Sequence, residues 1–228
     1  MKRGSWAFII FAVAAATTPA HAGNLDLRMG AFQPRADTGA VNDLFRDHSA
    51  LYTVDKGDWL GFAGGAQYNA KVAKNVEIGF AIDGYEKTVD TAYRDYGGAG
   101  NRDIEQTLKL DIVPMSFELR LTPTSRRVRV APWIGAGGDL YYWKYEAFGE
   151  FIDFTRANQP ISTDSFISEG VNVGFHVSAG LRFAITDDVG IIAGARYQWG
   201  TANMGDDFRN NKLDLSGATY TAGVNIRF

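Results

Sequence analysis

Apolar and polar residues alternate with a period of two from residue 23 to the end of the chain. Between residues 171 and 183 every second residue is Val, Phe, Ala or Leu, while Asn, Gly, His, Ser and Arg fill the positions between them. Such alternation predicts β-strands with one apolar and one polar face. The predicted strands cover residues 25–30, 66–72, 76–83, 108–121, 128–143, 171–183, 191–199 and 220–228.

The fourth predicted strand changes phase in its middle. Its apolar residues stand at even positions from Leu108 to Ile112 and at odd positions from Met115 to Leu121, with Pro114 between the two sets. Because proline cannot donate a backbone hydrogen bond to a ladder, we expect a β-bulge at Pro114.

The connections between the strands alternate in length. Residues 73–75, 122–127 and 184–189 form short links, whereas residues 35–58, 93–104, 148–170 and 200–212 form long ones. Short turns at one end and long loops at the other are typical of bacterial outer-membrane barrels. The pattern predicts an all-β chain that folds as one domain, an eight-stranded antiparallel up-and-down transmembrane β-barrel over residues 23–228, with both termini on the periplasmic side.

Three features indicate that the apolar face points outward into lipid. Charged residues share the polar face with many glycines, as a narrow barrel interior requires: Gly30, Gly65, Gly79, Gly135, Gly137, Gly174, Gly180, Gly194 and Gly223. Aromatic residues gather near strand ends, which predicts two interfacial girdles: Trp59, Tyr141, Tyr142, Trp143, Tyr145, Tyr197 and Trp199 toward the long loops, and Trp133 and Phe228 toward the short turns. The chain also ends on an amphipathic strand that closes with Phe228 in phase with the apolar face.

The first 22 residues have the order of a secretory signal peptide. Lys2 and Arg3 precede an apolar run from Trp6 to Ala16, and a small-residue site ends at Ala22. We expect cleavage before Gly23, which lowers the formal charge from −3 to −5 because two cations and no acids are removed. The chain has no cysteine, so a disulfide or a thiolate site is excluded.

Several segments carry a resemblance to a known family. They are Asp43-Leu-Phe, Leu51-Tyr-Thr-Val, Leu119-Arg-Leu-Thr-Pro123, Pro132-Trp-Ile-Gly-Ala-Gly-Gly138 and Phe175-His-Val-Ser-Ala-Gly180. In these and in its terminal strand the chain resembles the outer-membrane β-barrel domain family and is similar in architecture to the OmpX and OmpA barrels. The resemblance implies a fold, a location in the cell outer membrane, and recognition by the assembly machinery of that membrane. It implies no substrate.

Two sets of residues could support an enzyme. His176 and Ser178 share one face of a strand, where a base could activate a nucleophile, and they resemble the His-x-Ser of lipid A deacylases. By phase, however, they face the interior with Asn172 and Arg182, so an internal polar network is the interpretation we favour. Asp47, His48 and Ser49 are residue types that lipid A acyltransferase barrels use, but neighbours in sequence rarely converge on one atom.

Charges of both signs occupy the predicted interior. A cross-barrel network that fills the lumen is the expected role of these residues, and the lining of a narrow pore is the alternative. They are Asp26, Arg28, Lys71, Glu77, Asp83, Glu118, Arg120, Arg129, Asp139, Arg182, Arg196 and Arg227.

The third long loop, residues 148–170, combines aromatic and acidic residues without the spacing of a calcium loop. We expect it to pack its own aromatic side chains against the barrel rim, and a contact with a hydrophobic ligand or another cell's surface is the alternative.

The sequence therefore predicts an integral outer-membrane protein with a structural or surface-binding role, in which the long loops carry any specificity. The alternatives are a lipid A-modifying enzyme and a narrow channel for small or hydrophobic solutes. We expect no catalytic, cofactor or metal site. The expected partners are outer-membrane lipid and lipopolysaccharide and the assembly machinery, and the expected state is a monomer. The scattered charges exclude nucleic acid as a partner.

Overall fold

The computed structural model describes residues 23–36, 44–98, 102–122, 128–208 and 211–228. The predicted signal peptide, residues 1–22, lies outside this part of the chain. Among the described residues, no helix has the length and the apolar character needed to cross a membrane.

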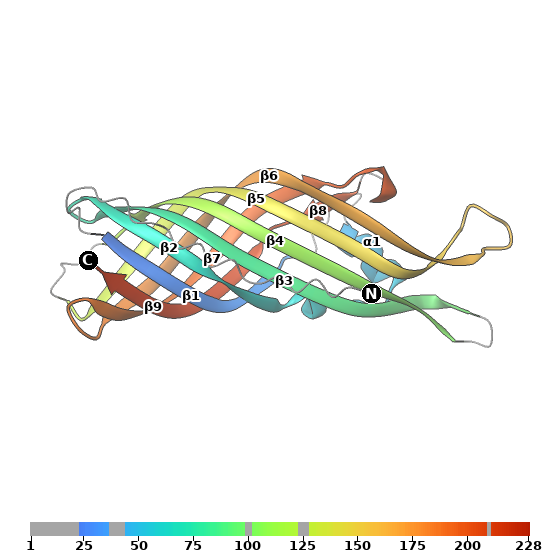
Figure 1. The fold of residues 1–228 in the computed structure, drawn as a ribbon, viewed down its shortest axis with the longest axis horizontal. Helices are drawn as coiled ribbons and strands as arrows, with labels where there is room; N and C mark the ends of the chain where they lie inside the picture. Colours follow the sequence, from blue (N-terminus) through green and yellow to red (C-terminus); the bar gives the residue numbers. More distant parts are fainter. Residues whose placement is uncertain (1–22, 37–43, 99–101, 123–127, 209–210) are drawn as a thin grey trace.

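Eight antiparallel strands close into a ring (Figure 1). Each strand from β1 to β6 pairs with the next one along the chain, β9 pairs with both β1 and β7, and the pairing of β6 with β7 completes the ring. The bounds are β1 (Gly23–Pro34), β2 (Gly61–Ala73), β3 (Val76–Gly97), β4 (Asp103–Leu121), β5 (Val130–Ile152), β6 (Ile161–Ala184), β7 (Val189–Asn203) and β9 (Gly217–Arg227). The predicted eight-stranded up-and-down barrel is confirmed.

In the part of the long connections that the structure describes, there are four short elements. They are α1 (Leu44–Leu51), the 3-10 helices η1 (Lys56–Trp59) and η2 (Asp206–Phe208), and the short strand β8 (Lys212–Asp214), which pairs with β7. At the opposite end of the barrel Gly23 and Phe228 exchange two backbone hydrogen bonds of 3.1 and 3.2 Å. The described chain ends therefore meet at the short-turn end, as predicted.

The outer wall carries an apolar belt, which we define as the exposed apolar side chains around the ring near the short-turn end. Exposed belt residues on all eight barrel strands include Leu27, Tyr68, Phe80, Phe117, Ile134, Val177, Ile191 and Val224. An exposed apolar surface that encircles a whole barrel would be unfavourable in water, and it matches the hydrocarbon of a bilayer. The apolar face therefore points outward, as the sequence indicated.

A line of charged residues marks the upper edge of this belt. Gly84, Val113, Tyr142 and Val171 occupy matching outward positions on β3, β4, β5 and β6. Two residues further from the short turns, charged residues lie opposite one another in the strand ladders. Glu86 is opposite Asp111, Asp111 is opposite Lys144, and Lys144 is opposite Glu169. We call these four residues the charged row. Because charged side chains avoid hydrocarbon, each of these four strands leaves the membrane at or below its residue in the row.

Above the charged row, strands β3 to β6 continue as an extension with an inverted arrangement of apolar and polar faces. Its inner face buries Leu108, Leu110, Ile112, Trp143 and Tyr145. Helix α1, η1, η2 and β8 contribute further buried side chains to this core, including Leu44, Phe45, Trp59, Phe208 and Leu213. The outer face carries ion pairs such as Lys109 with Glu86 at 2.8 Å. Outside the membrane the barrel is thus built like an ordinary water-soluble protein.

This inversion shows that the predicted bulge at Pro114 was wrong. The register between β3 and β4 is the same on both sides of the proline, with Ile82 opposite Met115 and Tyr85 opposite Ile112. Even positions face inward along the whole of β4. The apolar residues change phase because the interior changes from polar to apolar at this level, while the exterior changes from lipid to water.

The predicted aromatic girdles are only partly correct. Tyr142 and Phe228 are exposed on the outer wall, whereas Trp59, Trp133, Tyr141, Trp143 and Tyr145 are buried inside the barrel. On β5 the odd positions face inward, and the sequence had already placed Asp139 and Gly137 on that face. Tyr141, Trp143 and Tyr145 also stand at odd positions, and this is the signal in the sequence that places their rings inside the barrel.

Two predicted long loops are largely strand. Residues 148–152 and 161–170 continue β5 and β6 as a paired hairpin, so the connection shrinks to residues 153–160. Strand β3 likewise extends to Gly97, beyond its predicted end. These hairpins project past the ring at the end opposite the C-terminus (Figure 1).

Candidate functional site

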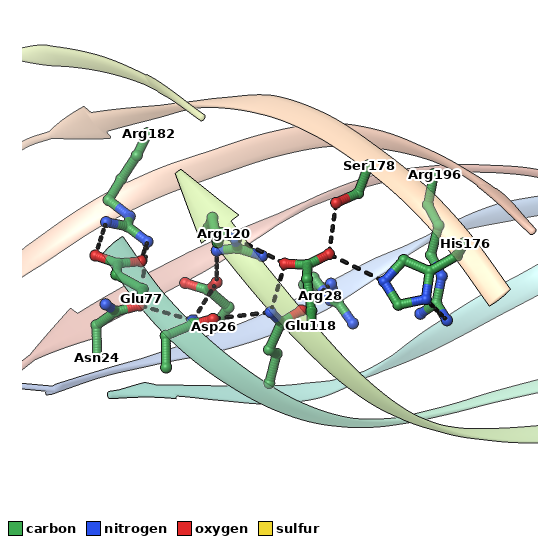
Figure 2. A network of polar contacts seen from close by, with 12 residues as sticks. Asn24, Asp26, Arg28, Glu77, Glu118, Arg120, His176, Ser178, Arg182 and Arg196 are labelled. Atoms are coloured by element: carbon green, nitrogen blue, oxygen red, sulfur yellow. Dashed lines mark hydrogen bonds and ion pairs between the residues drawn. The ribbon is translucent and has the colours of Figure 1, made fainter. Parts of the chain in front are cut away.

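At the level of the belt, inward-facing polar side chains form the luminal network, the group of ionised and hydrogen-bonding residues drawn in Figure 2. Arg120, on β4, lies at its centre and is 0% exposed. Its Nε donates to Glu118 at 2.9 Å, and its Nη1 donates to Asp26 of β1 at 3.0 Å. The guanidinium carbon also lies 3.9 Å from the ring centroid of Trp133, in cation–π geometry. One cation thus joins strands on opposite parts of the wall.

Two further arginines bridge the barrel toward the extension. Nη2 of Arg28 donates to both oxygens of Asp83, at 2.9 and 2.8 Å, so one nitrogen makes charge-assisted contacts with the whole carboxylate. Arg196 of β7 lies 3.4 Å from the same carboxylate and also donates to Asp139 of β5. Asp83 therefore links β1, β3 and β7 across the lumen.

Toward the short turns, Arg182 closes the network. It donates to the two carboxylate oxygens of Glu77, at 3.3 and 3.2 Å, and to the side-chain oxygen of Asn24 at 3.2 Å. Asn24 in turn accepts hydrogen bonds from Asn69 and Asn225, both fully buried. The predicted cross-barrel network is present, and it continues through neutral amides that sequence reasoning had not singled out.

The two candidate catalytic residues on β6 belong to this network. Nδ1 of His176 lies 2.9 Å from Asp139, and its Nε2 lies 3.2 Å from Glu118. Ser178 donates its hydroxyl proton to Glu118 and not to His176. A base that activates serine must accept that proton, so this arrangement favours the structural interpretation over nucleophilic catalysis.

The charges of the network balance when His176 is protonated. Both of its ring nitrogens face carboxylates, to which an imidazolium can donate from both sides, and Nη2 of Arg196 also lies 3.1 Å from Nδ1. The cation then joins four arginines opposite five carboxylates, which are Asp26, Glu77, Asp83, Glu118 and Asp139. Buried ions are tolerated when they are paired in this way.

Glycines on the inner face provide the space that the network needs, as the sequence predicted. A Cβ atom on Gly135 would lie 2.7 Å from both Glu118 and Ser178, and one on Gly79 would lie 2.5 Å from Gln67. A larger residue at either position would displace hydrogen-bonding side chains.

Three predicted interior charges lie at the short-turn mouth. Arg129 is exposed, and Lys71 and Arg227 are half-buried, with Nε of Arg227 donating to Asn225 at 3.2 Å. The prediction that Arg129 is interior was wrong, because this residue precedes the first residue of β5 and lies outside the ring.

Above the network, α1 and η1 form a plug, which we define as residues 44–59, packed on the inner face of the extension. Phe45 contacts Trp59 with ring centroids 5.2 Å apart, and Trp59 lies 6.3 Å from Tyr145 of β5. The second candidate catalytic set lies here, and its members do not converge. Asp47 accepts from Asn211, His48 bonds the hydroxyl of Tyr145 at 2.9 Å, and Ser49 donates to the carbonyl of Arg46.

Acid is expected to loosen the plug through His48. Burial lowers the pKa of His48 to about 4 from an ordinary value of 6.5, because the packed ring loses the water that would solvate its charged form. The undocked segment therefore takes up a proton first as the pH falls. As the pH falls from 6.5 to 4, the free energy that favours docking of the plug should decrease by at most about 3 kcal/mol. It should not decrease further below pH 4.

Amide hydrogen exchange of α1, corrected for intrinsic rates, measures this effect at pH 7 and pH 4.5. A His48→Phe variant keeps a ring against Tyr52 and should lose most of the pH dependence. Equal pH dependence in that variant and in the wild-type chain would show that another group controls docking.

The hairpin of β5 and β6 packs part of its aromatic content, as expected for this segment. Phe151 and Phe166 form an edge-to-face pair at 4.9 Å, and Phe154 lies 5.2 Å from Tyr96 of β3. Phe148 remains exposed on the outer surface. The carboxylate of Glu150 accepts two hydrogen bonds from Arg102, at 2.7 and 2.8 Å, which ties this hairpin to the neighbouring one.

A small cavity lies between the luminal network and the apolar core. Its volume is about 40 Å³, and Arg28, Asp83, Tyr85, Arg196 and Thr221 are among the residues that line it. That volume has room for only a few water molecules. Within the described residues, no group of three or more histidine and acidic side chains could hold a metal ion.

Comparison of the structure with solved structures identifies the fold. It is similar to Neisserial surface protein A, at 14% sequence identity and a TM-score of 0.50, over 92% of this chain and 98% of that one. It is also similar to the outer membrane protein OprG from Pseudomonas aeruginosa, at 13% identity and a TM-score of 0.55, over 92% of this chain and 96% of that one. No protein-family model and no curated protein matches the sequence. The chain has the fold of a small outer-membrane β-barrel, and its apolar belt fits the hydrocarbon of that membrane.

Proposed function

We propose that the chain is a closed outer-membrane barrel, residues 23–228 after removal of a signal peptide, with a structural or surface-binding role. The filled lumen carries this proposal. Arg120, Asp26 and Glu118 are at most 4% exposed in the middle of the barrel. A conducting pore requires a continuous column of water, and ion pairs that lock side chains across the lumen oppose one.

The extension supports the surface-binding part of the proposal. Its apolar core gives the four long strands a fixed shape outside the membrane, and ion pairs such as Lys109 with Glu86 keep its outer surface polar. A rigid platform of this kind presents side chains to solvent without losing order, which lowers the entropic cost of binding a partner. The chain would accordingly act through its long-loop end, as a monomer that needs no cofactor.

Planar bilayer recording tests whether the barrel is closed. The mature chain, folded in detergent and inserted into bilayers, should give no single-channel current above leak, because the paired side chains leave no water-filled path. A porin inserted under the same conditions serves as the positive control. Stable unitary currents from the folded chain would contradict the proposal and favour a narrow channel.

A further inference from the structure

Strands β6 and β7 part near the upper edge of the belt. The ladder between β6 and β7 ends at the pair Gly174 and Gly200. Beyond that pair β7 continues with β8, through Thr201 opposite Asp214, while β6 continues with β5 as far as Ile161. A hollow of about 450 Å³ lies where the two strands part. We call it the wall hollow, and its volume falls in the range of sites for small molecules.

The lower part of the wall hollow is apolar. Val173 is 77% exposed, and the rings of Phe175 and Trp199 stack at 4.8 Å with an interplanar angle of 19°. All three line the hollow, and Val173 and Phe175 continue the apolar belt on β6. An acyl chain can therefore lie against this surface without exposing either partner to water.

Glycines make the floor of the hollow. A Cβ atom on Gly174 would lie 2.5 Å from Cε2 of Tyr141, and one on Gly200 would lie 2.9 Å from the same atom. The fully buried ring of Tyr141 therefore closes the wall behind these two glycines. The hollow faces the outside of the barrel, and this ring separates it from the luminal network.

Two cations line the upper part of the wall hollow. Lys212 of β8 is exposed, and the side chain of Arg35, just after β1, is 38% exposed. Nε of Arg35 lies 3.6 Å from the buried carboxylate of Asp214, which leaves one net positive charge among the three groups. Val171, two residues beyond Val173 on β6, lies at the belt edge directly below the charged row. Lys212 lies opposite Asn203, three residues beyond Gly200 on β7, so the cations lie past the apolar surface on the side of the charged row, where lipid headgroups are expected.

We propose that the wall hollow binds one phosphate-bearing lipid of the outer leaflet, of the lipid A type. A phosphate would contact Arg35 and Lys212, and one acyl chain would run along Val173, Phe175 and Trp199. A net positive charge above an apolar surface, at the height of the headgroups, is complementary to an anionic amphipathic lipid. This inference rests on the proposed function, because it requires the long-loop end to face the outer leaflet.

Lipid binding to the folded chain tests the site. The mature chain in detergent micelles would be titrated with lipid A and with dephosphorylated lipid A, and bound lipid would be measured by native mass spectrometry. The double variant Arg35→Gln, Lys212→Gln should bind lipid A at least tenfold more weakly, since each basic residue at a membrane surface is worth about fivefold. The matched control is Lys144→Gln, Arg156→Gln, which removes the same charge elsewhere on the long-loop end. A Thr201→Trp variant should block the hollow and also weaken binding.

Binding of lipid A that is unchanged in the Arg35, Lys212 variant, or equal for dephosphorylated lipid A, would overturn the proposed site. A wild-type dimer that Thr201→Trp converts to a monomer would also overturn it, because a second copy would then occupy the hollow. Each of these results could be obtained with a folded, non-conducting barrel. The two lipid-binding results would refute the lipid site and leave the proposed function intact, whereas the dimer would also contradict the proposed monomeric state.

Discussion

Replacing Arg120 with Leu should destabilise the barrel by about 3–5 kcal/mol, the typical cost of removing one partner from a buried ion pair. The leucine leaves Asp26 and Glu118 without their shared cation in the interior, where both are at most 4% exposed. It also removes the cation over the ring of Trp133. Urea unfolding of the chain in lipid bilayers, followed by tryptophan fluorescence, measures the loss.

The matched control for this change is Arg156→Leu. Arg156 makes an ion pair with Asp153 at 3.1 Å in the exposed turn between β5 and β6, where its side chain is 70% exposed. Exposed pairs contribute little to stability, so this variant should unfold within about 1 kcal/mol of the wild-type chain. Equal losses in the two variants would mean that the luminal network does not hold the barrel together.

Replacing Phe117 with Arg should cost about 2–4 kcal/mol, because the charge would enter the hydrocarbon. Phe117 is 58% exposed on the outer face of β4, between Leu121 at the end of the strand and Val113 at the belt edge. In a protein surrounded by water the same substitution at such an exposed position would be nearly neutral. The free energy of unfolding in bilayers of matched thickness measures the difference.

Thr107→Arg is the control on the same face of the same strand. Thr107 lies above the charged row, and its hydroxyl donates to Asp90 at 2.8 Å, so an arginine there would meet a carboxylate and water. We expect a change within about 0.5 kcal/mol. If both substitutions cost the same, contact with lipid would not explain the exposed apolar belt.

The two expected results address opposite faces of one wall. The network around Arg120 holds the inside together by paired charges, while Phe117 and its neighbours hold the outside in lipid. Above the charged row the arrangement reverses, and apolar residues such as Leu108 and Tyr145 hold the extension together from within. The proposed surface role depends on this second core, because it keeps the long strands ordered in water.

Much of the candidate site could be predicted from the alternation of odd and even positions along the strands. His176, Ser178, Arg182 and Glu118 all lie on the inner face that the alternation assigned to them. The sequence could not show that Ser178 donates to Glu118, which is 60 residues away, or that His48 bonds Tyr145, which is 97 residues away. Such pairs follow from the closure of the ring and from the packing of the plug, which no local pattern records.

The sequence by itself determined the strands, their antiparallel order and the two unlike faces of the wall, because side chains on a strand alternate with period two. It also determined that the lumen at belt level is polar, since glycines and charges share one parity. A period of two does not show whether lipid or water lies on the outer face of a strand. The phase change at Pro114 could therefore come from a bulge or from a change in the surroundings of an unbroken strand. Only the tertiary structure, by aligning Glu86, Asp111, Lys144 and Glu169 across four strands, showed where lipid ends and water begins.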